Sequence, residues 1–188
     1  METLLKIANK YINSGSRVLE LGCGGGNFIR AVAKDNPEAS AVCIDYYNEP
    51  KDLPPSVRFI KQNLEEFELE EKFDLIIINH VLEHIKNPLG LLEKAKKKLN
   101  KNGKILIVVP NRDGFGNEAR VYLPEHGKHY FLWDRESLQY SLERLGFVCR
   151  FHNLYVAGTH NIFLKYIPAL LRIKNPNLIC IAMLDMAE

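Results

Sequence analysis

The chain has 188 residues, of which 46% are hydrophobic and 26% are charged, and this composition is typical of a globular protein with one buried core. Its 25 basic and 23 acidic residues leave a net charge of only +2, so no overall positive field favours nucleic acid as a partner. The sequence has no apolar run of the roughly 18 residues that span a membrane and no secretory signal at its N-terminus, and we therefore expect one soluble, cytoplasmic domain over residues 1–188.

Apolar residues at helical spacing begin the chain and predict an N-terminal helix over residues 1–14 that packs on the domain. Short, continuous apolar runs follow, and such runs are typical of parallel strands that are buried on both faces. Helices are predicted between them over 28–33 and over 89–99, the second with Leu89 and Leu99 on its apolar face. In chain order, the predicted strands are 18–21, 41–44, 57–60, 75–78 and 105–109.

The C-terminal third continues with a helix that Asp134 can cap and that Gly146 can end, followed by strands over 147–151 and 178–183. Alternation of strand and helix predicts an α/β fold with a doubly wound, mostly parallel sheet. Residues 156–177 form an amphipathic insert before the last strand, with apolar and basic side chains concentrated in 162–174. This stretch fits a core helix, a dimer contact or a peripheral membrane contact.

A glycine-rich segment follows the first predicted strand, where an open parallel sheet binds its ligands. The glycines of residues 22–26 lack a Cβ atom, so the backbone can turn sharply and a ligand can lie against it. A dinucleotide-binding loop needs Gly-x-Gly-x-x-Gly, but Asn27 or Ile29 occupies the last position here. The segment therefore disfavours a pyrophosphate ligand.

The same segment resembles the first motif of the class I S-adenosylmethionine-dependent methyltransferases. Glu20, Gly22, Gly24 and Gly26 fill the fixed positions of that motif, and Cys23 lies between them. The resemblance implies a Rossmann-like, seven-stranded sheet with an antiparallel last strand and helices on both faces. It also implies that the loop faces the amino-acid part of S-adenosylmethionine, while the acidic residue orients the loop and the ammonium.

The resemblance also assigns residues to the nucleoside of the cofactor. Asp45 ends the second predicted strand, and its carboxylate would accept hydrogen bonds from both ribose hydroxyls. Tyr46 would pack on the adenine. After the third strand the family carries an acidic residue that accepts from the adenine amine; the candidates here are Gln62, Asn63 and Leu64, and Asn63 would supply an uncharged acceptor.

Residues 79–85 resemble the corresponding segment of small-molecule methyltransferases of ubiquinone biosynthesis and sugar modification, and the likeness continues through 99–111. It implies that Asn79 and His80 lie beside the methionine end of the cofactor. Enzymes that methylate base amines carry Asn or Asp, then Pro-Pro and an aromatic residue, at this point, which the sequence does not match. The segment also fits a zinc peptidase pattern in which His80 and His84 hold zinc and Glu83 is the base.

Methyl transfer from a sulfonium requires alignment of the reactants and, for a protonated acceptor, a base. In related enzymes the segment after the fifth strand covers the substrate, so residues 111–133 are expected to form a substrate lid, although their aromatic residues would equally suit a core. No clear set of carboxylates marks a metal site, and none is expected. The candidate catalytic residues are His80, Glu83, His84, His126 and His129.

The sequence thus predicts an enzyme that transfers a methyl group from S-adenosylmethionine to an O, N or C atom of a small-molecule acceptor. Two alternatives stay open. One is a non-catalytic scaffold domain that binds S-adenosylmethionine or a nucleotide, and the other is the zinc peptidase.

Overall fold

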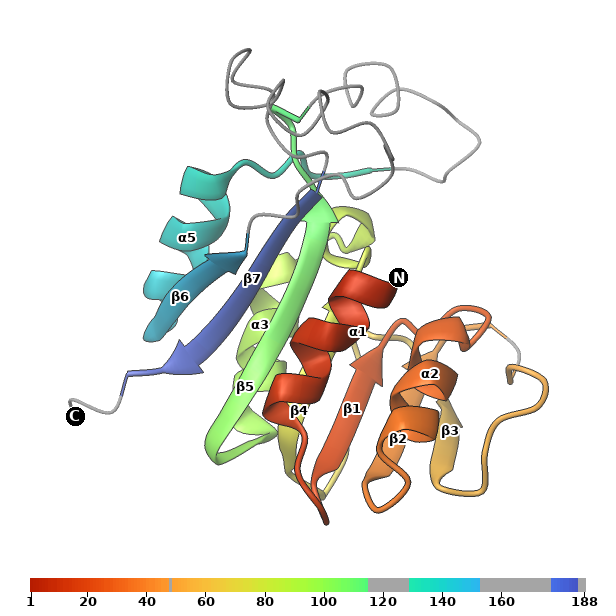
Figure 1. Cartoon of the computed structure of the whole chain (residues 1–188). Helices are drawn as coiled ribbons and strands as arrows, with labels where there is room; N and C mark the ends of the chain where they lie inside the picture. Colours follow the sequence, from red (N-terminus) through yellow and green to blue (C-terminus); the bar gives the residue numbers. More distant parts are fainter. Residues whose placement is uncertain (48, 115–128, 153–176, 186–188) are drawn as a thin grey trace, which may run out of the picture.

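The computed structural model describes residues 1–47, 49–114, 129–152 and 177–185 of the chain. In these residues, a seven-stranded sheet has the order β3-β2-β1-β4-β5-β7-β6 (Figure 1). The first five strands of the chain pair in parallel, whereas β7 runs antiparallel to both β5 and β6. The predicted α/β class and its antiparallel last strand are confirmed. The strands are β1 (Arg17–Leu21), β2 (Ser40–Asp45), β3 (Val57–Lys61), β4 (Phe73–Asn79), β5 (Leu99–Pro110), β6 (Phe147–His152) and β7 (Asn177–Leu184).

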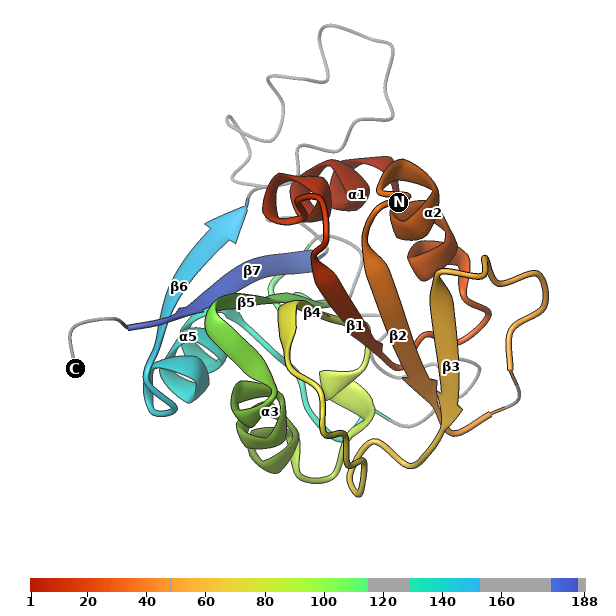
Figure 2. The ribbon, with the colours of Figure 1, turned by 90° about the horizontal axis from the view of Figure 1, so that it is seen from below.

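Helices cover both faces of the sheet. In the part of the chain that the structure describes, the α-helices are α1 (Glu2–Ala8), α2 (Asn27–Asp35), α3 (Pro88–Lys97) and α5 (Arg135–Glu143). α1 and α2 lie on one face, and α3 and α5 lie on the other (Figure 2). Side chains of β1 alternate between the two core layers, since Val18 packs with the first pair of helices and Leu19 with the second. Both faces are therefore buried, which explains why the central strands are apolar at successive positions.

The sheet changes its direction of winding between β1 and β4. β2 and β3 lie on one side of β1, and β4 and β5 lie on the other. The loops after β1 and β4 therefore diverge, and in doubly wound sheets this is where a ligand crevice opens at the carboxyl ends of the strands. The glycine-rich segment follows β1, and the segment 79–85 follows β4, so the topology brings the two predicted motifs to one place.

Two helix predictions need correction. α3 ends at Lys97, and Leu99 instead opens β5 and pairs with Phe73 of β4. Leu89 is 42% exposed, because the buried face of α3 is formed by its neighbours along the helix. Helical periodicity alone cannot reveal the strand pairing that draws Leu99 out of the helix. At the N-terminus, α1 ends at Ala8 and is followed by a short 3-10 helix, η1 (Asn9–Tyr11).

Two predicted segments lie outside the described residues, namely the centre of the predicted lid, 115–128, and the amphipathic stretch 162–174. Within the residues that are described, none of the helices has the length and apolar character needed to cross a membrane.

Candidate active site

The glycine-rich loop turns through three residues with left-handed backbone. Gly22, Gly24 and Gly26 have φ values of 76°, 50° and 73°, a conformation that costs little only for glycine. A Cβ atom on Gly22 would lie 2.4 Å from Cγ2 of Val81, so glycine is needed there for close packing. A Cβ atom on Gly24, in contrast, would meet no atom within 4 Å. The space beside Gly24 is thus open, and the bare backbone faces it.

Glu20 lies in β1, just before this loop, and is only 2% exposed. Burial is the main cause that raises the pKa of its carboxyl group well above the usual value, and the nearby Cys23 and Asp45 add to it. A hydrogen bond from the backbone N–H of Ile29 acts in the opposite direction, while Oε2 has no hydrogen-bond partner. A buried carboxylate oxygen that lacks a donor is costly, and an ammonium group of a ligand would satisfy it.

Asp45, the last residue of β2, holds the loop from the side. Its Oδ2 accepts a hydrogen bond from the backbone N–H of Gly24 at 2.7 Å, and its Oδ1 accepts from that of Tyr47 at 3.0 Å. Each carboxylate oxygen retains a lone pair for a further donor. The carboxylate is therefore fixed next to the open space at Gly24, where ribose hydroxyls would find an acceptor.

The other predicted nucleoside contacts lie at different depths. Tyr46 is 67% exposed, so its ring is free of the core. Asn63 is exposed, and its Oδ1 accepts from the N–H of Glu65 at 3.0 Å. Leu64 is buried against the loop, with Cδ1 3.4 Å from the position of a Cβ on Gly22. Leu64 therefore lies beside the loop through its side chain, whereas Asn63 and Tyr46 remain at the surface.

The segment after β4 does not form the helix that a zinc peptidase motif requires. His80 has a left-handed φ of 55°, and only the three residues of η2 (Leu82–His84) are helical, as a 3-10 helix. His80 and His84 are therefore not on one face of an α-helix. The N–H of His80 donates instead to the carbonyl oxygen of Val108 in β5 at 2.9 Å. The structure contradicts the peptidase alternative.

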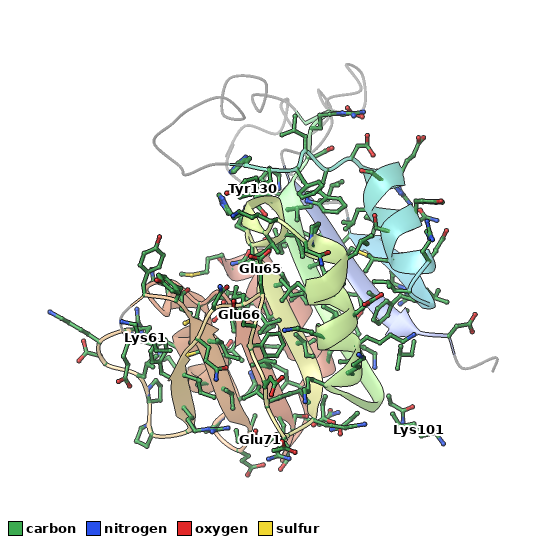
Figure 3. The ribbon with its side chains drawn as sticks, turned by 180° about the vertical axis from the view of Figure 1, so that it is seen from behind. Lys61, Glu65, Glu66, Glu71, Lys101 and Tyr130 are labelled. Carbon is green, nitrogen blue, oxygen red and sulfur yellow. The ribbon has the colours of Figure 1, made fainter. Side chains whose placement is uncertain are left out.

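Glu83 is a third buried carboxylate of the site, in addition to Glu20 and Asp45, with 1% exposure. Its Oε1 lies 3.3 Å from Nδ1 of His80, and its Oε2 has no hydrogen-bond partner. Its backbone carbonyl accepts the N–H of Tyr130 at 2.7 Å, which ties the end of the predicted lid to this segment. Figure 3 shows Tyr130 at the carboxyl end of the sheet, at the opposite end of the molecule from Glu71.

The segment that carries Tyr130 also brings His129 next to His84. Their ring centroids are 4.7 Å apart, at an interplanar angle of 70°. One ligand atom each of Glu83, His84 and His129 lie within 4.8 Å of one another. From the sequence, Glu83, His84 and His129 are each predicted as a candidate base. No signal in the sequence indicates that they lie close together, because His129 is far from the other two along the chain. His126, the remaining candidate, lies outside the described residues.

The aromatic residues of the predicted lid divide into two groups. Trp133 is 5% exposed and belongs to the core, and its backbone forms an isolated β-bridge with Asn111. Tyr130 and Phe131 are 42% and 39% exposed. The core interpretation is thus confirmed for Trp133, and the substrate lid stays a prediction.

A buried acid before an open glycine loop, a second acid at the end of β2 and this strand order define the class I fold that binds S-adenosylmethionine. A family model described as a methyltransferase domain matches residues 1–150. The chain belongs to this family, and the predicted membership in the class I S-adenosylmethionine-dependent methyltransferases is confirmed.

Known proteins show the same likeness. The chain is 26% identical to the mitochondrial ubiquinone biosynthesis O-methyltransferase of Schizosaccharomyces pombe over 122 residues, which are 60% of this chain and 44% of that protein. It is 29% identical to an uncharacterized protein of Methanocaldococcus jannaschii over 150 residues, or 76% of this chain and 69% of the other. The chain spans less than half the length of the ubiquinone methyltransferases that it matches.

Solved structures support the fold. The plantazolicin methyltransferase BpumL in complex with SAH has a TM-score of 0.72 at 19% identity, covering 97% of this chain and 81% of that one. A SAM-dependent methyltransferase from Archaeoglobus fulgidus has a TM-score of 0.73 at 19% identity, with coverage of 97% and 92%.

Proposed function

We propose that this protein transfers the methyl group of S-adenosylmethionine to an O, N or C atom of a small-molecule acceptor. The observation that carries the proposal is the open space at Gly24 beside the Asp45 carboxylate, which is already fixed to the loop. The buried Glu20, whose Oε2 has no hydrogen-bond partner, lies in the preceding strand, two residues before Gly22. These groups are complementary to the ammonium and the ribose of the cofactor. The cofactor, when bound, supplies an electrophilic methyl group on a sulfonium.

The cofactor-binding residues have distinct roles in this proposal. Glu20 pairs with the ammonium, and Asp45 accepts from the ribose hydroxyls. Gly22, Gly24 and Gly26 let the backbone approach the amino-acid part. Tyr46, Asn63 and Leu64 surround the adenine, and Cys23, Asn79 and His80 border the methionine end.

The acceptor is expected on the side of His80, Glu83 and His84. Backbone hydrogen bonds to the carbonyl oxygen of Glu83 bring residues 130 and 131 to this segment. His80 and Glu83 form a close pair, and its imidazole or carboxylate can take a proton from the acceptor. The buried carboxylate orients the exposed imidazole. Since 44% of the side chain of His80 is exposed, the acceptor can reach it from solvent.

A small-molecule acceptor is supported by the small net charge, which supplies no field for a polyanion. Two similar proteins are named for ubiquinone biosynthesis and for plantazolicin, which agrees with a small-molecule acceptor. Another, from Geobacter metallireducens, is named as a tRNA (guanine-N(7)-)-methyltransferase. We place the protein in the cytoplasm. The stretch 162–174 remains our candidate for a dimer or peripheral membrane contact.

The test is turnover. The full chain is incubated with S-adenosylmethionine that carries a labelled methyl group and with a panel of phenols, carboxylic acids and amines. We expect labelled product and S-adenosylhomocysteine in equal amounts with at least one acceptor class. Binding of S-adenosylhomocysteine without turnover on the whole panel would favour the scaffold alternative and contradict the proposal.

A further inference from the structure

The cluster of Glu83, His84 and His129 has a composition that general base catalysis alone does not require. It joins one carboxylate and two imidazoles from two segments that are distant along the chain. Each offers a ligand atom, and these atoms lie within 4.8 Å of one another. Glu83 is buried, and the two histidines are half-buried. Three converging ligand atoms from one carboxylate and two imidazoles match the protein ligand set of a metal centre that keeps a further position for water or substrate.

A second, independent observation also points to a cation. Oε2 of Glu83 has no hydrogen-bond partner, although the side chain is only 1% exposed. Leaving a buried carboxylate oxygen without a donor costs the full desolvation of that group. Oε1 is already engaged by Nδ1 of His80 at 3.3 Å. A donor or a cation from outside the described residues would satisfy this oxygen, and a metal ion held by the two neighbouring imidazoles would serve.

The ligand types restrict the ion. Magnesium and calcium prefer oxygen ligands, whereas two imidazoles and one carboxylate suit zinc, iron(II), manganese(II) or cobalt(II). With bond lengths of about 2.0–2.2 Å, tetrahedral ligand atoms lie about 3.4 Å apart. Separations of up to 4.8 Å thus need only a small inward movement of the two rings. His80 would orient the carboxylate from outside the first ring of ligands.

We propose that Glu83, His84 and His129 bind one divalent transition metal ion, and that the open coordination positions of this ion take an oxygen atom of the methyl acceptor. Metal binding itself is independent of the reaction, whereas the role toward the acceptor rests on the proposed function. A hydroxyl that coordinates such an ion loses its proton to water far more readily than a free one. The acceptor would then be a phenol or another hydroxyl compound.

The proposal also accounts for the link between the two segments. The N–H groups of Tyr130 and Phe131 both point to the carbonyl oxygen of Glu83, at 2.7 and 3.4 Å. An ion shared by Glu83 and His129 would fasten the same connection through side chains. Residues 129–131 would therefore be held against the end of β4 both by the backbone and by the ion.

The experiment uses the full chain after treatment with a chelator. Zinc chloride is titrated by calorimetry, and cobalt(II) is added in parallel to record its visible absorption. We expect one ion per chain with a Kd in the micromolar range or tighter, and cobalt bands typical of four or five ligands. His129→Gln and Glu83→Gln should each weaken zinc binding by at least tenfold, with unchanged circular dichroism.

Glu71→Gln is the matched control. It makes the same change of charge at the other end of the sheet, where Glu71 pairs with Arg58 on the surface (Figure 3), and its zinc affinity should equal that of the unmodified chain. Absence of stoichiometric zinc binding, or equal binding by all variants, would overturn the proposal. Calorimetry with S-adenosylhomocysteine on the same metal-free sample separates the two claims, because normal binding there leaves the proposed function intact when the metal site fails.

Discussion

The two sides of the crevice are built in different ways. The cofactor side, around Gly24 and Asp45, consists of backbone and of a carboxylate that is hydrogen-bonded to it, all from two neighbouring strands. The acceptor side consists of side chains from the ends of two distant segments, joined by contacts such as that between His84 and His129. The first side depends on the pairing of β1 with β2, whereas the second depends on the contact of residues 83–84 with residues 129–131. Substitutions should therefore separate binding of the cofactor from turnover.

The largest effect should come from filling the cofactor side. Gly24→Val places a branched side chain in the open space and should abolish detectable binding of S-adenosylhomocysteine in calorimetry. The backbone strain at a left-handed φ costs roughly 1–2 kcal/mol of stability. Gly15→Val is the matched control, since Gly15 also has a left-handed φ of 75° and open space but precedes β1, at the opposite end of the strand. It should lose similar stability and bind normally. Equal binding by both folded variants would refute the site.

On the acceptor side, Glu83→Gln should lower kcat by about 10²-fold or more, because it removes the carboxylate that orients His80 or deprotonates the acceptor. The affinity for S-adenosylhomocysteine should stay within about twofold, since Glu83 faces the acceptor rather than the loop. Initial rates at saturating cofactor, measured beside Glu71→Gln, give the comparison. A variant that turns over normally, or that loses cofactor affinity instead, would show that the two sides are not separate.

Asp45→Ala should have a smaller effect on binding. Loss of its charge-assisted hydrogen bonds should weaken cofactor affinity by about 1–3 kcal/mol, or roughly 5- to 150-fold. Asp45→Asn retains one acceptor oxygen, and its cofactor affinity should lie between those of the unmodified chain and the Ala variant. Calorimetry at one pH ranks the three proteins. An Asn variant weaker than the Ala variant would mean that the carboxylate acts only on the loop, through Gly24.

The smallest effect concerns pH and Glu20. Burial raises the pKa of this carboxyl group well above 4.5 in the folded chain, so the folded state retains a proton that the unfolded state has released. This contribution to stability is complete below pH 4.5 and is lost as the pH rises through the raised pKa. Glu20→Gln should therefore flatten the fall of Tm with rising pH in the cofactor-free protein. An equal slope of Tm against pH in the variant and the unmodified chain would show that Glu20 does not cause this fall.

The sequence predicted the cofactor side more completely than the acceptor side. The reason is that the first depends on neighbouring residues and the second on residues that are distant along the chain. The seven strands of the described residues, apart from the start of β5, and the glycine loop follow from local patterns, because continuous apolar runs and bare backbone turns are encoded in neighbouring residues. The peptidase pattern failed because a left-handed residue, His80, breaks the helix that the spacing alone suggested. The proximity of Glu83 and His129 depends on the return of the chain after β5, which no local pattern records.

The measurement that bears most directly on the cofactor side is a pair of calorimetric titrations of the unmodified chain, one with S-adenosylhomocysteine and one with NAD. We expect one molecule of S-adenosylhomocysteine to bind per chain with micromolar affinity, and NAD to give no heat of binding. Binding of NAD with no response to S-adenosylhomocysteine would mean that the loop holds a pyrophosphate, and would contradict the assignment of this crevice.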